Sequence, residues 1–335
     1  MKSIQTPCLS ILMTFDSELL RIPTLRQVQL LIIMCGKIFC VGQVTVDIEH
    51  VLSQGMPEED GKKRSIECHW RRGGNASNNC TVLSLLGADC SFFGNVPDNL
   101  FWKYAKENFD FYNIDTSHCV TYDGSYEFPL STVIVNAQNG SRTIVHSNKN
   151  LPEIRADDFS KVDLSQFGWI HIEGRNSPEL HKILRIAQKH ATKTGTTVSV
   201  ELEKKRDGLL ELAQYAKVVF ISKDFAAFHG WRDMDTAIEG MKQHIQKGTA
   251  VICPWGELGA VAYQSDVGLV RSQSYPPPEV IDTLGAGDTF IAATIFSLSK
   301  NTSLQQAIDF GCRTAGAKVG GKGFDMIKDA KNSIL

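Results

Sequence analysis

A glycine turn that leads into an apolar helix is the part of the sequence best suited to chemistry. Residues 282–290 read DTLGAGDTF, and the apolar run that follows predicts a helix opening at Asp288. The first amides of a helix have no partner within it, so those of Gly285, Ala286 and Gly287 could bind an anion. A carboxylate beside such an anion hole could act as a base in phosphoryl transfer. A plain tight turn followed by a favourable first-turn acid explains this stretch equally well.

A second glycine turn precedes another predicted helix. Residues 73–78 read GGNASN, in which Gly74 allows close approach of a ligand to the backbone. Asn75 and Asn78 are three residues apart, which puts both amides on one face of the helix. Amide side chains both donate and accept hydrogen bonds, so the pair suits vicinal hydroxyl groups. Asn75 as an ordinary helix N-cap is a strong alternative.

Regular alternation of strands and helices sets the predicted fold. Lys37–Val44 predicts a first buried strand, and Asp47 follows it at the edge where parallel α/β sheets bind ligands. For a single residue of this kind, a strand-end turn without function is the commoner explanation. From residue 168 onward, repeated strand–helix units predict an α/β fold with a doubly wound, mostly parallel sheet.

Two segments of short strands without intervening helices predict a smaller sheet that projects from the main body. They span about 48–72 and 119–147, and Arg142 lies in the predicted hairpin of the second. Such a sheet commonly serves as a lid or as a dimer surface.

Length and composition narrow the class of protein. The chain has 335 residues, a formal net charge of −2 and nine scattered cysteines. We interpret residues 1–35 as a poorly ordered N-terminal extension, and residues 36–335 as one main domain. No basic block interleaved with aromatic residues predicts nucleic-acid binding, and no apolar run is long enough to span a membrane. Unpaired core thiols favour a reducing, cytoplasmic location. The fingerprints of dinucleotide-binding enzymes and P-loop NTPases are missing.

Taken together, GGNASN and DTLGAGDTF resemble the two signatures of the ribokinase-type (PfkB) carbohydrate kinases. The resemblance runs from about Lys37 to Asp325 and is strongest to the ketohexokinase branch of that family. It rests there on NCTVLSLLG at 79–87, GSRTI at 140–144, WIHIEGRN at 169–176, VSVELEK at 198–204, VVFISKD at 218–224 and PPPEVIDTLGAGDTF at 276–290.

The resemblance implies a ribokinase-like fold and ATP-dependent phosphorylation of D-fructose at its 1-hydroxyl. Asp288 would be the general base, and the amides of residues 285–287 would form the anion hole. The implied sugar-binding residues are Asp47, Gly74, Asn75, Asn78 and Arg142. The implied nucleotide-binding residues are Arg142, Lys223, Glu257, Gly259, Pro277, Gly285 and Gly287.

The resemblance also implies the small partners of the reaction. Mg²⁺ would arrive with ATP, and the strand end at 222–225 reads SKDF instead of an N-x-x-E turn. The further ligands of the ion therefore stay open between Glu173, another acid and water alone. A monovalent cation such as K⁺ and a homodimer joined through the projecting sheet are further implications. Two alternatives stay open: a PfkB kinase for another small sugar or a nucleoside, and a non-catalytic sugar-binding paralogue. Retention of Asp288 argues against the second.

Overall fold

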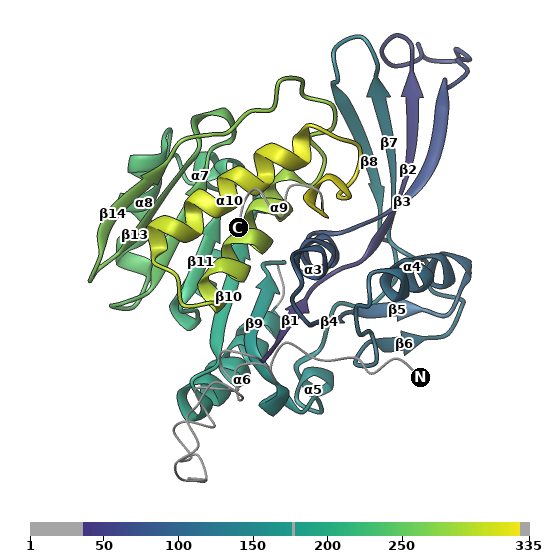
Figure 1. Cartoon of the computed structure of the whole chain (residues 1–335). Coiled ribbons are helices and arrows are strands. Elements are labelled where there is room, and N and C mark those ends of the chain that lie inside the picture. Colours follow the sequence, from purple (N-terminus) through teal and green to yellow (C-terminus); the bar gives the residue numbers. More distant parts are fainter. Residues whose placement is uncertain (1–35, 176–177, 329–335) are drawn as a thin grey trace, which may run out of the picture.

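The computed structural model describes residues 36–175 and 178–328, so the extension predicted over residues 1–35 lies outside it. An eight-stranded sheet forms the centre of the molecule, in the order β14-β13-β12-β11-β10-β9-β1-β4 (Figure 1). The strands from β12 to β4 are parallel, whereas β13 and β14 add as an antiparallel hairpin. The predicted doubly wound, mostly parallel sheet is therefore confirmed. Its strands are β1 (Lys37–Val41), β4 (Cys90–Phe93), β9 (Phe167–Glu173), β10 (Thr197–Leu202), β11 (Val218–Ile221), β12 (Ala250–Pro254), β13 (Ala260–Gln264) and β14 (Gly268–Ser272).

Helices cover both faces of this sheet, because alternate residues of its buried strands point to opposite sides. Ile38 and Cys40 of β1 pack in one core cluster with α3, α9 and α10. Phe39 and Val41 pack in a second cluster with α5, α6, α7 and α8. The helices are α3 (Asn75–Leu86), α4 (Leu100–Phe111), α5 (Ala156–Phe159), α6 (Pro178–Thr194), α7 (Lys223–Phe228), α8 (Met234–Met241), α9 (Ala286–Ser299) and α10 (Leu304–Val319). Short 3₁₀ turns are η1 (Leu164–Gln166), η2 (Leu210–Tyr215), η3 (Lys242–His244) and η4 (Gly256–Leu258).

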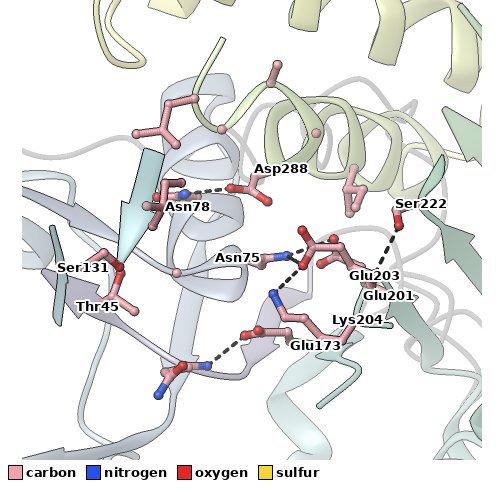
Figure 2. A pocket seen from close by; sticks show the side chains of 18 of the residues that line it. Thr45, Asn75, Asn78, Ser131, Glu173, Glu201, Glu203, Lys204, Ser222 and Asp288 are labelled. Atoms are coloured by element: carbon pink, nitrogen blue, oxygen red, sulfur yellow. Dashed lines mark hydrogen bonds and ion pairs between the residues drawn. The ribbon is translucent and has the colours of Figure 1, made fainter. Parts of the chain in front are cut away.

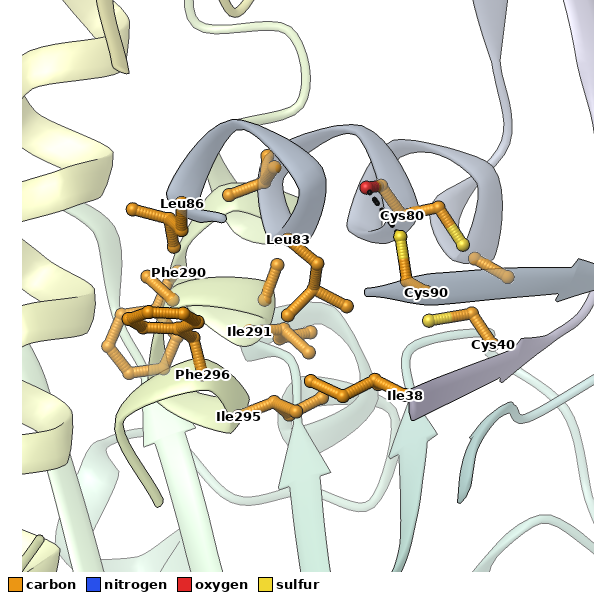
Figure 3. Close-up of a cluster of buried hydrophobic side chains, with 14 of the residues drawn as sticks. Ile38, Cys40, Cys80, Leu83, Leu86, Cys90, Phe290, Ile291, Ile295 and Phe296 are labelled. Carbon is orange, nitrogen blue, oxygen red and sulfur yellow. Dashed lines mark hydrogen bonds between the residues drawn. The ribbon is translucent and has the colours of Figure 1, made fainter. Parts of the chain in front are cut away.

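Helix α9 is buried along most of its length, as its apolar sequence predicts. Residues from Thr289 to Ser297 are all buried between the sheet and neighbouring helices. Figure 3 shows Phe290, Ile291 and Ile295 of α9 facing Leu83 of α3 and Ile38 of β1. This packing sets α9 beside α3, so the two glycine turns that begin these helices meet at the same edge of the sheet.

A second sheet of four strands, which we call the projecting sheet, extends from the main body (Figure 1). Its order is β3-β2-β7-β8, with β2 and β7 parallel and the other pairs antiparallel. The predicted hairpin is therefore present as β7 and β8. The four strands are β2 (Thr45–Leu52), β3 (Glu67–Gly73), β7 (Leu130–Asn136) and β8 (Arg142–Ser147).

Two predictions about these strands are wrong. Asp47 does not follow the first strand at the edge of the main sheet; it lies inside β2, because β1 ends at Val41 and the chain re-enters extended structure at Thr45. Val120–Tyr122, expected in the projecting sheet, forms β6 and pairs with β5 (Asn95–Pro97) in a separate two-stranded sheet. Alternation over three residues shows that a strand exists but does not identify its partner.

The cysteines within the described residues are free thiols, and five of them are buried: Cys40, Cys80, Cys90, Cys253 and Cys312. The prediction of unpaired core thiols therefore holds for this part of the chain. None of the helices described is both long and apolar enough to cross a membrane.

Phe39 at the centre of β1 offers a test of the second core cluster. Its side chain is fully buried and stacks on Phe167 with ring centroids 4.3 Å apart. We expect Phe39→Ala to lower the free energy of unfolding by about 3–5 kcal/mol, because it removes buried area and leaves a cavity. Denaturant unfolding measures the loss. Phe111→Ala is the control, since Phe111 is 68% exposed and should change stability little; equal losses would contradict the assignment of the core.

Candidate active site

A cavity of about 550 Å³ lies between the carboxyl edge of the main sheet and the projecting sheet. It brings together nine residues that the sequence singled out. These are Asp47, Gly74, Asn75, Asn78, Arg142, Gly285, Ala286, Gly287 and Asp288. They come from β2, β8 and the beginnings of α3 and α9, so the wall of the cavity is assembled from segments distant in the chain.

The beginning of α9 supplies one wall of the cavity. Gly285 is the N-cap with φ of 76°, and no side chain caps the amides that follow it, although that of Ala286 donates to the backbone oxygen of Thr283 at 3.3 Å. Asp288 stands in the first turn, where its carboxylate accepts a hydrogen bond of 2.7 Å from Asn78 Nδ2 (Figure 2). Asn79 Nδ2 also donates to the backbone oxygen of Asp288, at 2.9 Å. The two helix beginnings are thus joined by hydrogen bonds as well as by core packing.

The surroundings of Asp288 make its carboxyl group a stronger base than an ordinary aspartate. Burial raises its pKa to about 7, with the Glu203 and Glu173 carboxylates adding to the rise. The hydrogen bond from Asn78 opposes them because it stabilises the charged form. A carboxyl group with a pKa near neutrality is suited to accept a proton at physiological pH.

Acidic side chains from the ends of β9 and β10 form a second wall. Asn75 Nδ2 donates to Glu201 Oε1 at 3.1 Å and to Glu203 Oε2 at 2.8 Å. Lys204 Nζ lies 2.5 Å from the same oxygen of Glu203 (Figure 2). Burial, together with Glu203, Asp288 and Glu173, raises the pKa of Glu201 well above its usual value. Asn75 is therefore not an N-cap; Gly74 occupies that position and Asn75 binds the acids.

Glu201, Glu203 and Lys204 are site residues that sequence reasoning did not select, and Glu173 was raised only as one possible acid for Mg²⁺. A signal existed, since polar residues at the ends of parallel strands mark the ligand-binding edge of such sheets. The sequence contains no motif that distinguishes these charged residues from charged residues on the protein surface. Glu173 is only 3% exposed, and its Oε2 accepts from the backbone amide of Gln43 at 2.9 Å.

The projecting sheet forms the third wall. Asp47 is opposite Ser131 in β7, which is in turn opposite His146 in β8, so all three share one face. Thr45 Oγ1 donates to Asp47 Oδ1 at 3.1 Å, and Ser131 Oγ lies 3.2 Å from His146 Nδ1. Burial raises the pKa of Asp47, and the hydrogen bonds from Ser131 and Thr45 oppose the rise. Arg142 is exposed at the start of β8 and also borders the cavity.

Two buried side-chain oxygens of the cavity have no hydrogen-bond partner within the described residues. They are Asn78 Oδ1 and Glu201 Oε2. Because buried acceptors are nearly always satisfied in native proteins, such atoms indicate the place of a bound donor. A ligand that carries hydroxyl groups would supply donors at Asn78, beside the Asp288 carboxylate.

The remaining nucleotide-binding predictions fall on residues that do not line this cavity: Lys223, Glu257, Gly259 and Pro277. Lys223 begins α7 with its Nζ 5.7 Å from the centre of the Trp255 ring. Gly259 has φ of 85° and lies close to Ser272, where a side chain would not fit. A role in nucleotide binding stays a prediction for all four.

A protein-only metal centre is not found in the part of the chain that the structure describes, where no group of three or more His, Cys, Asp or Glu side chains could hold an ion. The acidic wall can therefore assist a cation that brings other ligands with it, but it does not form a complete coordination shell.

Comparison with known proteins places this site in context. The model of the pfkB family carbohydrate kinases matches residues 36–328. Ketohexokinase of Mus musculus is 47% identical over 295 residues, which cover 87% of this chain and 98% of the mouse protein. Fructokinase of Salmonella typhimurium is 25% identical over 287 residues, covering 80% and 86% of the two chains. The structure of Arabidopsis thaliana ribokinase with ribose and ATP superposes with a TM-score of 0.75 at 18% identity, covering 90% of this chain and 98% of that one.

The two glycines of the turn before Asp288 should respond differently to alanine. At Gly285 the backbone has positive φ and an added Cβ would lie 2.7 Å from the Phe324 ring, so Gly285→Ala should lower stability by about 1–2 kcal/mol. At Gly287 an added Cβ meets no protein atom within 4 Å, so Gly287→Ala should leave the melting temperature unchanged or slightly raised. Thermal unfolding of both variants checks this, and an equal loss at Gly287 would contradict the open geometry.

Proposed function

We propose, from the premise that the chain belongs to the pfkB family of carbohydrate kinases, that it is a ketohexokinase. The reaction is transfer of the γ-phosphoryl group of ATP to the 1-hydroxyl of D-fructose, giving fructose 1-phosphate and ADP. The 47% identity to mouse ketohexokinase over nearly its whole length supports this substrate. The observation that carries the proposal is the Asp288 carboxylate, which lies at the open N-terminus of α9 in the cavity that Asp47, Asn75 and Asn78 also line.

In this mechanism Asp288 takes the proton of the 1-hydroxyl as the hydroxyl oxygen attacks the γ-phosphorus. The bond from that phosphorus to the oxygen bridging to the β-phosphate breaks, and ADP leaves with the electron pair. Negative charge on the transferring group is stabilised by the amides of Gly285, Ala286 and Gly287, which have no acceptor inside α9. A base that is ionised near pH 7 and fixed by Asn78 requires no rearrangement for the proton transfer.

The sugar would be held between the beginning of α3 and the projecting sheet. The unpartnered Asn78 Oδ1 can accept from one sugar hydroxyl, and Asp47 from another. Gly74 is needed for the shape of this turn, since its φ is 95° and a Cβ there would lie 2.3 Å from the backbone oxygen of Gln43. Arg142 at the edge of the cavity offers a fork of donors to the sugar or to the phosphates.

ATP and Mg²⁺ are the cofactors of the proposal. Mg²⁺ supplies charge neutralisation of the phosphates, and it would be held mainly by phosphate oxygens and water. The buried Glu201 Oε2 has no partner, which suits a water molecule of such a cation, and Glu203 and Glu173 stand beside it. Lys223, Glu257, Gly259 and Pro277 are proposed to contact the nucleotide outside the cavity.

Assembly and location complete the proposal. A homodimer joined through the projecting sheet is supported by the apolar side chain of Val145 on β8, which is 62% exposed and lies on the face opposite to Ile144 and the cavity. The free thiols support a cytoplasmic location.

A monovalent cation such as K⁺ is proposed as an activator on the strength of the family resemblance. Light scattering at working concentration tests the dimer, and a titration of KCl against constant ionic strength tests the cation.

Replacement of Asp288 tests the chemistry. We expect Asp288→Asn to lower kcat with fructose and ATP by at least about 10²-fold, because the amide cannot accept the proton. Burial raises the pKa of Asp288, so its charged form costs stability above that pKa, and the variant should not be less stable than the parent at pH 8. A coupled ADP assay, calorimetric binding of fructose and thermal unfolding give the three readouts.

The exposed Asp157, whose side chain is 80% accessible, provides the matched control as Asp157→Asn. A panel of other sugars and nucleosides run with the parent separates ketohexokinase from a kinase for a different acceptor. Absence of turnover with every acceptor, together with retained sugar binding, would support a binding paralogue instead. Near-normal kcat in Asp288→Asn would remove Asp288 from the mechanism.

The pH dependence of the reaction gives a second test. With the base at a pKa of about 7, kcat/KM should fall about tenfold per pH unit below pH 7, as the carboxylate takes up a proton. The hydrogen bond from Asn78 lowers that pKa, so Asn78→Ala should move the acid limb of the profile to higher pH. The comparison uses the midpoint of the limb and not the absolute rate, because Asn78 also faces the sugar. A midpoint that stays fixed or moves downward would contradict the assignment.

A further inference from the structure

Four side chains of alternating charge connect the projecting sheet to the loop that leads into α9. Glu49 of β2 lies 3.2 Å from Arg71 of β3, Glu49 Oε2 to Arg71 Nη2. Arg71 Nη1 donates to Asp282 Oδ2 at 3.0 Å, and Lys318 Nζ of α10 lies 3.1 Å from the same oxygen. The order is therefore negative, positive, negative, positive, from the projecting sheet to the last helix. We call these four residues the charge chain.

The Asp282 carboxylate at its centre is fully engaged with the loop around it. Its Oδ1 accepts from the amide of Leu284 at 2.9 Å, and its Oδ2 accepts from the amide of Gly323 at 3.0 Å. Lys318 Nζ also donates to the backbone oxygen of Asp282, at 2.7 Å. Asp282 comes three residues before Gly285, so these bonds fix the backbone at the entrance to the anion hole.

Burial makes the charge chain sensitive to the loss of any member. The Lys318 side chain is fully buried, and those of Asp282, Glu49 and Arg71 are 11%, 12% and 23% exposed. Burial alone would raise the pKa of Asp282, but Lys318 and Arg71 hold it below its usual value. An ion pair in such surroundings gives little net stability, yet removal of one partner leaves a charge without compensation.

Arg71 is the member that joins two parts of the candidate active site. In the β2–β3 register it stands opposite Asp47, the proposed sugar-binding carboxylate. Through Asp282 it contacts the loop of the anion hole, 211 residues away in the chain. One guanidinium group therefore borders the wall that holds the sugar and the loop that receives the phosphoryl group.

We infer that Arg71 is a positioning residue for phosphoryl transfer, which holds the root of the projecting sheet and the anion-hole loop in register through Glu49 and Asp282. The inference rests on the proposed function. Arg71 need not touch either substrate: its effect is to place the amides of residues 285–287 where charge develops on the phosphoryl group. Displacement of such donors by about 1 Å can cost up to about 10² in rate, whereas ground-state binding depends less on that placement.

The test compares Arg71→Met with Arg71→Lys in the full-length chain. We expect Arg71→Met to lower kcat about tenfold while the KM values for fructose and ATP change by less than about threefold. Arg71→Lys should recover part of kcat, because one ammonium can still contact Asp282. If Arg71 only stabilised the fold, Arg71→Met would lower the free energy of unfolding without lowering kcat at nearly constant KM.

Lys322→Met is the matched control. Lys322 Nζ pairs with Glu67 of β3 at 2.8 Å, so it also links the projecting sheet to the segment after α10, but it does not contact Asp282. Its loss should leave kcat within twofold of the parent. An equal loss of kcat in Lys322→Met, or a normal kcat in Arg71→Met, would overturn the inference.

Amide hydrogen exchange separates a failure of this inference from a failure of the proposed function, because it needs no substrate. Peptides covering residues 282–290 should exchange faster in Arg71→Met than in the parent, and at the parent rate in Lys322→Met. Unchanged exchange in Arg71→Met would overturn the inference whatever the enzyme phosphorylates. Faster exchange in Arg71→Met alone, with no activity toward fructose in the parent, would uphold the loop contact and reject the substrate.

Discussion

The fixed distance between the beginnings of α3 and α9 is the constraint on which the rest of the site depends. It is set first by burial, because the apolar residues of α9 are covered by the sheet on one side and by α3 and α10 on the others (Figure 3). The hydrogen bonds from Asn78 and Asn79 to Asp288 then fix the rotation of one helix against the other. Fully packed helices have little freedom to adjust, so the proposed base and anion hole on the first turn of α9 are already in place before a ligand binds.

The charged residues around the cavity change the proton affinity of the carboxylate that this geometry holds in place. Three glutamates, Glu173, Glu201 and Glu203, reach the cavity from adjacent strand ends, while Lys204 and Arg175 offset only part of their charge. The surplus of negative charge keeps the proton affinity of Asp288 high. The same surplus favours a ligand that brings its own cation, which agrees with a nucleotide bound as its magnesium complex. In the proposed mechanism the acidic wall therefore serves both the base and the cofactor without forming a complete metal site.

The fold and the two glycine turns could be predicted because their signals lie within short stretches of sequence. The first buried strand was predicted from Lys37 and β1 begins there, and Asp288 falls in the first turn of α9 as expected. Contacts between distant strands could not be predicted in the same way. Asp47 was assigned to the wrong sheet, and the link from Arg71 to Asp282 spans 211 residues without any local pattern. Contacts between residues so far apart in the chain depend on how the two sheets pack against each other, and this packing cannot be read from a single sequence.

The position of Asp47 changes how the projecting sheet should be understood. A carboxylate at the edge of the main sheet would bind sugar whether or not that second sheet moved. Because Asp47 lies near the start of β2, on the same face as Ser131 and His146, every displacement of the projecting sheet displaces a wall of the cavity. In the proposed function, sugar binding and the orientation of this sheet are therefore one equilibrium, in which a sugar that contacts both walls stabilises the arrangement that brings them together. The charge chain acts at the root of the same sheet, so it links the orientation of that sheet to the loop before α9.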